Sequence, residues 1–269
     1  MPLAAPLGEV GNNANRSYPE ETCVTAHNLV DVHDEQKGGY RLREFTLRAT
    51  FDRVVTGVLW IPDGASGAAP LVCCGHGASG DRFAAPIPWM AKQWARDHGF
   101  GVLSIDGPVH GRRASGPGGR EAVWAEWQRL ETVDEMLVDW KTALDFAQAQ
   151  PELGVAAVGY WGLSMGTIYG APMVAAEPRV TAAVLGLMGI TGPAHYRPII
   201  QAAAKAIDIP TLFIMQLEDE LFSREICLEL FDALGSADKQ LHANPGSHPE
   251  VPVPQIQATI DYLARRLSL

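Results

Sequence analysis

A serine stands at the centre of a glycine motif, Gly162-Leu163-Ser164-Met165-Gly166, in this chain of 269 residues. An apolar run at 155–161 precedes the motif, and small residues such as Gly170 follow it. A serine at a sharp turn from a strand into a helix presents its hydroxyl for attack, and flanking glycines let neighbouring backbones approach closely. The motif therefore predicts Ser164 as a nucleophile, with an idle serine in a glycine-lined turn as the alternative.

Three carboxylates, Glu218, Asp219 and Glu220, follow the apolar run 211–215 and compete to assist such a nucleophile. A serine hydroxyl needs a general base to take its proton, and the base needs a carboxylate to orient it. Asp219 has the most suitable place, a few residues beyond the end of the expected strand. Glu218 and Glu220 are expected to be solvated loop residues or first-turn charges of the following helix.

His248 is the candidate base, because it lies in a Pro-Gly turn directly after the expected strand 240–243. It follows the candidate serine and aspartate in the chain, an order typical of one large class of serine hydrolases. A histidine in a surface turn is the alternative. His242 lies inside the expected strand and is expected to be a face residue. His195 precedes the carboxylates and has the wrong order for the base, but it lies where it could contact substrate.

Acyl chemistry also requires N–H donors for the negative oxygen that forms when a serine attacks a carbonyl. The N–H that follows the nucleophile, that of Met165, is the first candidate. The glycine-rich loop 75–80 can turn its amides inward, and Ala78 is its candidate donor, with Gly77 and Ser79 as alternatives. His76 in the same loop is expected to be a structural hydrogen-bonding residue.

Apolar runs alternate with helical patterns through most of the chain, which predicts a mainly parallel sheet with helices on both faces. Ligands bind outside the carboxyl ends of the strands in such sheets, and the candidate residues lie there. The first two strands are expected to be antiparallel, which makes the sheet mixed. Strands are expected at 40–50, 54–61, 71–74, 101–105, 155–161, 180–187, 211–215 and 240–243, and helices at 86–98, 120–150 (one or two), 224–234 and 254–266.

The chain is expected to form a single α/β domain over 26–269, preceded by an arm at 1–25 that is rich in Pro, Gly, Asn and Ala. The segment 189–209 is a short insertion with room for one helix, so the cap over the site is minimal.

Charge and composition limit the function classes further. The formal net charge is −10, which argues against a nucleic-acid partner. No secretory signal and no apolar stretch long enough to span a membrane is visible, so a cytoplasmic location is expected. The four cysteines form no CxxC pair, so neither a zinc site nor another metal or redox motif built on cysteines is expected. Cys73 and Cys74 are expected to point to opposite faces of one strand.

The motifs in sequence resemble the α/β-hydrolase superfamily. The stretch 159–166 (GYWGLSMG), together with Pro178-Arg179-Val180, looks most like the dienelactone hydrolase and acetyl xylan esterase-like branch. The motifs that match in order are His76-Gly77-Ala78, Asp106-Gly107-Pro108 with His110-Gly111, the serine motif, Asp219 and His248. This resemblance implies an eight-stranded mixed sheet and hydrolysis of carboxylic esters without a cofactor. Dienelactone hydrolases use a cysteine nucleophile, so the serine here favours a generic esterase.

The predicted function is a serine hydrolase that cleaves carboxylic esters of small to medium size through an acyl-enzyme. An acyltransferase, a perhydrolase or a peptidase with the same triad is an alternative, as is a catalytically silent ligand-binding module. The oligomeric state stays open, with a homodimer as one option. Trp161 and Tyr169 are expected in the core. Candidate substrate-binding residues are Phe83, Trp89, Tyr196 and Arg112. Arg112 lies in a glycine-rich loop with Arg113 and Arg120, and either these arginines are simply solvated or one of them receives a substrate carboxylate.

Overall fold

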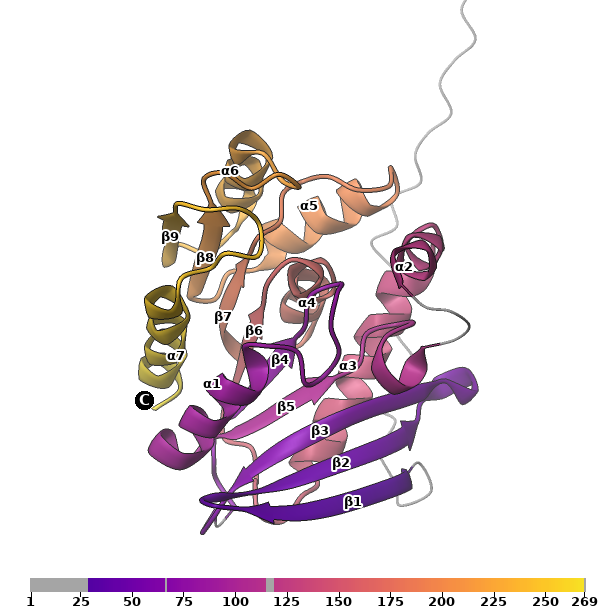
Figure 1. Ribbon diagram of the computed structural model, residues 1–269, viewed down its shortest axis with the longest axis vertical. Helices are drawn as coiled ribbons and strands as arrows, with labels where there is room; N and C mark the ends of the chain where they lie inside the picture. The colour runs from indigo at the N-terminus through magenta and orange to yellow at the C-terminus, as the bar shows by residue number, and fades with distance from the viewer. Residues whose placement is uncertain (1–28, 66, 115–118, 269) are drawn as a thin grey trace, which may run out of the picture.

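One mixed β-sheet of nine strands runs through the computed structural model of this protein, which describes residues 29–65, 67–114 and 119–268 (Figure 1). The order across the sheet is β1-β2-β3-β5-β4-β6-β7-β8-β9. The pairs β1–β2, β2–β3 and β3–β5 are antiparallel, and the pairs from β5–β4 to β8–β9 are parallel. The predicted α/β class is thereby confirmed. The strands are β1 (Leu29–Lys37), β2 (Tyr40–Arg48), β3 (Val54–Pro62), β4 (Leu71–Gly75), β5 (Gly101–Ile105), β6 (Val158–Gly162), β7 (Val180–Gly186), β8 (Thr211–Gln216) and β9 (Lys239–Asn244).

The edge strand β1 is a correction to the eight strands that were expected. Almost all of its residues are exposed, so it lacks the apolar run that marks a buried strand. Lys37 pairs with Tyr40, which leaves Gly38 and Gly39 as a two-residue hairpin turn. A Gly-Gly pair between two polar-apolar runs is a hairpin signal, and it could have revealed this strand.

Helices cover both faces of the sheet. The helix α1 is extended by a π-helical turn, η3, that stops at Gly99, where φ is +68°. Short 3₁₀ turns η2 (Thr50–Asp52) and η4 (Gly111–Arg113) lie in loops. The helices are α1 (Ile87–Gln93) with η3 (Trp94–His98), α2 (Gly119–Trp127), α3 (Thr132–Gln148), α4 (Met165–Ala176), α5 (Tyr196–Ala206), α6 (Arg224–Ala233) and α7 (Val253–Leu267).

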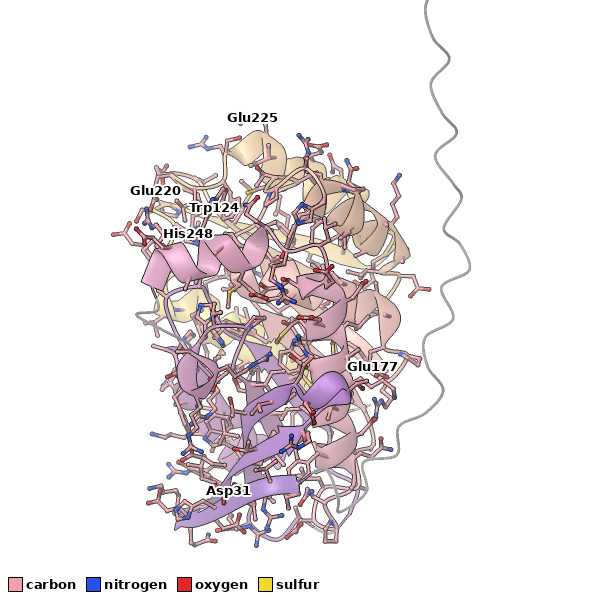
Figure 2. The ribbon with its side chains drawn as sticks, turned by 90° about the vertical axis from the view of Figure 1, so that its right-hand side faces the viewer. Asp31, Trp124, Glu177, Glu220, Glu225 and His248 are labelled. Atoms are coloured by element: carbon pink, nitrogen blue, oxygen red, sulfur yellow. The ribbon has the colours of Figure 1, made fainter. Side chains whose placement is uncertain are left out.

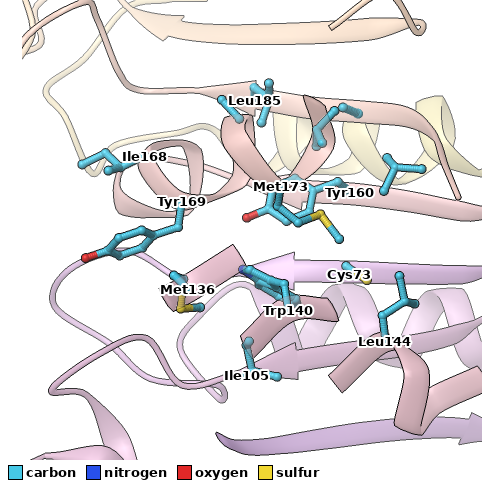
Figure 3. Packing of buried hydrophobic residues seen from close by; sticks show 14 of the residues in the cluster. Cys73, Ile105, Met136, Trp140, Leu144, Tyr160, Ile168, Tyr169, Met173 and Leu185 are labelled. Atoms are coloured by element: carbon cyan, nitrogen blue, oxygen red, sulfur yellow. The ribbon is translucent and has the colours of Figure 1, made fainter. Parts of the chain in front are cut away.

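The core has two layers, one on each face of the sheet. The helices α1 and α7 cover one face, and α3, α4, α5 and α6 cover the other. Cys73 belongs to the second layer and Cys74 to the first, as their adjacency on β4 predicted. Figure 3 shows the second layer, where the ring of Trp140 on α3 meets Tyr160 on β6 edge to face at 5.7 Å. Such aromatic pairs contribute about 1 kcal/mol beyond their buried area, so they fix α3 against the central strands.

The helical pattern at 120–150 forms two helices, α2 and α3, separated at residues 128–131. The apolar stripe along 120–150, which left one helix or two as alternatives, is not buried throughout. Trp124 is 57% exposed and Leu130 is 65% exposed, whereas Trp140 is fully buried. Of these two helices, only α3 packs along the sheet, and α2 stands apart from it (Figure 1).

The segment 189–209 between β7 and β8 holds one helix, α5, which packs on α4. The arm expected at 1–25 lies outside the described residues. No helix within the described ranges combines the length and apolar character that crossing a membrane requires.

Candidate active site

The candidate residues gather at the carboxyl ends of four strands. Register places Gly75 at the end of β4 opposite Gly162 at the end of β6. It also places Gln216 at the end of β8 opposite Asn244 at the end of β9. The loops that follow these strands therefore leave the sheet at one edge, where they can meet.

Ser164 lies between β6 and α4 with a backbone that non-glycine residues rarely adopt, at φ 58° and ψ −121°. Such a conformation costs roughly 1–3 kcal/mol and persists only where the surroundings impose it. Its N–H donates to the carbonyl oxygen of Gly186, 2.9 Å away. A Cβ at Gly166 would lie 2.4 Å from the carbonyl oxygen of Gly75, and one at Gly162 would lie 2.7 Å from that of Gly166. Both glycines of the motif are therefore required by close backbone approach.

Two hydrogen bonds connect Ser164, His248 and Asp219. His248 Nε2 lies 2.9 Å from Ser164 Oγ, and His248 Nδ1 lies 2.8 Å from Asp219 Oδ2. The Asp219 carboxylate is 1% exposed, and its other oxygen accepts the N–H groups of Leu221 and Phe222. Because the carboxylate can only accept, Nδ1 carries the proton and Nε2 is left to take one from the serine.

The N–H of Met165 is the first of α4, so it has no acceptor one turn earlier in the helix. This N–H lies at the N-terminus of α4, the positive end of the helix dipole, where negative charge is stabilised. This is the place that the sequence predicted for one oxyanion donor.

His76 fixes the peptide that carries the other predicted donor, the N–H of Ala78. His76 Nε2 accepts the N–H of Gly107 at 2.8 Å, so Nδ1 carries the proton and donates to the carbonyl oxygen of Gly77 at 2.8 Å. In a trans peptide the Gly77 carbonyl and the Ala78 N–H point in opposite directions. Holding the carbonyl therefore sets the direction of the N–H. Burial holds the pKa of His76 at about 4, which keeps this histidine neutral in its bridging role.

The buried carboxylate of Asp106 forms hydrogen bonds with Thr56 and with Arg82, which follows the same loop. It accepts the hydroxyl of Thr56 at 2.6 Å and, from Arg82, both the backbone N–H at 2.9 Å and a guanidinium N–H at 2.7 Å. Arg82 is 5% exposed. The sequence indicated Asp106 only as part of a motif and gave no signal for Arg82.

Solved structures provide the comparison, since no protein-family model and no curated protein matches this chain. A cold-adapted esterase from an Arctic intertidal metagenomic library is 36% identical, with a TM-score of 0.78 over 87% of this chain and 97% of that one. An α/β-hydrolase from Penicillium sp. sh18 is 16% identical, with a TM-score of 0.66 over 85% and 99%. This chain belongs to the α/β-hydrolase superfamily.

The enzyme class follows from the same comparison: the protein is a carboxylic ester hydrolase. The acetyl xylan esterase of Paenibacillus sp. R4 shares the fold, at 17% identity and a TM-score of 0.69 over 87% of each chain. In this esterase β2 to β9 form the eight-stranded mixed sheet that the resemblance implied, and β1 is added at the edge. The resemblance found in the motifs is confirmed.

The esterase has its four predicted substrate-binding residues in different environments. Trp89 on α1 is 40% exposed. The ring of Phe83 meets Trp60 edge to face at 5.9 Å. Tyr196 is buried in the core layer that also contains Tyr169. Their contact with substrate stays a prediction.

Arg112 of the esterase, the fourth of these residues, lies half exposed with its guanidinium 3.2 Å from Glu44. Arg113 pairs with the buried carboxylate of Asp139 at 2.8 Å. Both charges thus have protein partners.

Sequence reasoning missed Phe222, whose ring centroid lies 5.5 Å from that of His248.

Three other residues considered in the sequence, Trp161, His242 and His195, have the following places in the esterase. Trp161 is buried, and its indole N–H donates to Thr259. His242 on β9 bonds the side chain of Gln255, and His195 directly precedes α5. Within the described ranges, no group of three or more His, Cys, Asp or Glu side chains is arranged to hold a metal ion.

Proposed function

We propose that this esterase cleaves carboxylic esters of small to medium size through an acyl-enzyme on Ser164, with His248 as the general base and Asp219 as its orienting carboxylate. The observation that carries the proposal is the pair of hydrogen bonds, 2.9 Å and 2.8 Å, that links the three side chains. A serine, an imidazole and a buried carboxylate in this relation are the parts that nucleophilic acyl transfer needs.

In the first half of the reaction, Ser164 Oγ attacks the ester carbonyl carbon while its proton passes to His248 Nε2. The carbonyl oxygen becomes negative and receives the N–H groups of Met165 and Ala78. The C–O bond to the alcohol then breaks, and the alcohol leaves with the proton from Nε2. Asp219 stabilises the imidazolium that exists between these two proton transfers.

In the second half, water attacks the acyl carbon and gives a proton to His248 Nε2. The bond to Ser164 Oγ breaks, the serine regains its proton, and the carboxylic acid leaves. Each step uses protein groups and water. Removing one oxyanion donor typically lowers turnover about 100- to 1000-fold, so loss of the Ala78 donor should also slow the reaction strongly.

The test is a series of p-nitrophenyl esters of increasing acyl length, assayed with the wild-type enzyme and with Ser164→Ala. We expect turnover of short and medium chains by the wild type and none above background by the variant, whose thermal unfolding should be unchanged. Activity of the variant near the wild-type level would refute the role of Ser164. Peptides and alcohol acceptors in the same panel separate hydrolysis of esters from peptidase and transfer reactions.

A further inference from the structure

The turn that carries His248 is held by carboxylates at three consecutive backbone amides. Each N–H of residues 246–248 donates to a different glutamate, at 2.5–2.9 Å. Glu218 and Glu220 are exposed as the sequence predicted, but they are not simply solvated charges, because each bonds the backbone of another loop. The pairs are Gly246 with Glu218, Ser247 with Glu250, and His248 with Glu220.

The carbonyl groups of the same turn are held from the inside by one buried side chain. Gln216, 1% exposed at the end of β8, lies with its Nε2 at 2.9 Å from the carbonyl oxygen of Glu250 and at 3.2 Å from that of Pro245. The turn is therefore bonded on both sides by residues of the β8 end and by its own Glu250.

Two adjacent residues form hydrogen bonds with His248 itself. Asp219 bonds the ring at Nδ1, and Glu220 bonds the backbone N–H of the same residue at 2.9 Å. One bond fixes the rotation of the imidazole, and the other fixes the position from which the side chain starts. In Figure 2, Glu220 and His248 lie near each other, whereas Glu225, in the first turn of α6, lies apart.

We propose that Glu220 is a positioning residue for the base, acting through its bond to the His248 backbone; this role rests on the function proposed above. Its contribution is the acceptor oxygen, which holds the turn so that Nε2 stays within hydrogen-bond distance of Ser164 Oγ. A displacement of about 1 Å at a reacting group can lower a rate by about 100-fold. Glu220 is one exposed acceptor among several groups that hold the turn, so its loss should have a smaller effect, a decrease in kcat on the order of tenfold.

The experiment compares Glu220→Ala, Glu220→Gln and the control Glu225→Ala for kcat, KM and thermal unfolding, with one p-nitrophenyl ester. Glutamine keeps an acceptor oxygen at the same reach, and Glu225 makes no bond to the histidine turn. We expect kcat of Glu220→Ala to fall about tenfold with KM within about twofold, and Glu220→Gln to recover most of it. The control should match the wild type, and all three should unfold at the wild-type temperature.

Several results would overturn the role of Glu220 while leaving the proposed function intact; two of them concern kcat. One is a wild-type kcat in Glu220→Ala while Ser164→Ala is inactive, and the other is a loss in Glu220→Gln as large as in Glu220→Ala. Esterase activity that survives Ser164→Ala would instead overturn the proposed function and this role with it. A loss confined to KM, or one shared by Glu225→Ala, would assign Glu220 to general surface charge and also overturn the proposal.

Discussion

Acidification should destabilise this esterase through His76, the buried residue that bridges Gly107 and the Gly77 carbonyl. Burial lowers the pKa of His76 to about 4, from an ordinary value of 6.5. Between these values the unfolded chain binds a proton that the native state does not. The free energy of unfolding therefore falls as pH decreases from about 6.5 to about 4. At about 1.4 kcal/mol per pH unit, the loss approaches about 3 kcal/mol at the lower end of this window.

The assay is urea unfolding at several pH values from 7.5 to 4, for the wild type, His76→Gln and the control His98→Gln. His98 is exposed, so its replacement should leave the pH dependence of the wild type unchanged. His76→Gln should be less stable at pH 7, because glutamine cannot reproduce both bonds, but it should lose about 3 kcal/mol less on acidification. If the free energies of unfolding of His76→Gln and the wild type fall in parallel from pH 6.5 to 4, the reasoning is refuted.

Three further variants, one of them with a matched control, test other contacts. Asp219→Asn should lower kcat by about 10⁴-fold, because an amide stabilises the wrong tautomer of the base; a decrease under tenfold would contradict this. Gly166→Ala places a methyl group against a backbone oxygen and should cost about 1–3 kcal/mol in urea unfolding, whereas Gly77→Ala meets no atom within 4 Å and should be far milder. Arg82→Met leaves the Asp106 carboxylate buried without its charge partner and should destabilise the protein by about 3–5 kcal/mol, and a change under 1 kcal/mol would contradict the account.

Sequence patterns predicted most of the fold because the central strands are buried on both faces. Runs such as 71–74 and 211–215 are apolar without interruption, and this is the pattern of a parallel strand under two layers of helices. The edge strand β1 has no such pattern, because its side chains are exposed on both faces. Trp124 and Leu130 continue the helical spacing of apolar residues at 120–150, but both side chains are exposed and do not pack in the core. The spacing alone therefore left one helix or two as alternatives.

The three side chains expected to act together were found from chain order and from their places after strands. The side chains that hold these three residues in place were not predicted, because their contacts depend on which loops meet in the folded protein. Asp106 and Arg82 are 24 residues apart, and their buried ion pair follows from the placement of two loops at one sheet edge. The bonds of Glu218 and Glu220 to the His248 turn cross between loops in the same way. Polar residues in loops carry no period, so their partners are set by tertiary contacts that spacing cannot encode.

The most direct test of the central claim, that His248 activates Ser164, is the rate of covalent labelling by a fluorophosphonate probe, with the modified residue located by peptide mass spectrometry. We expect a single adduct on Ser164 in the wild type and a labelling rate at least about 1000-fold lower in His248→Ala. An adduct on another residue, or labelling of His248→Ala at the wild-type rate, would contradict the account.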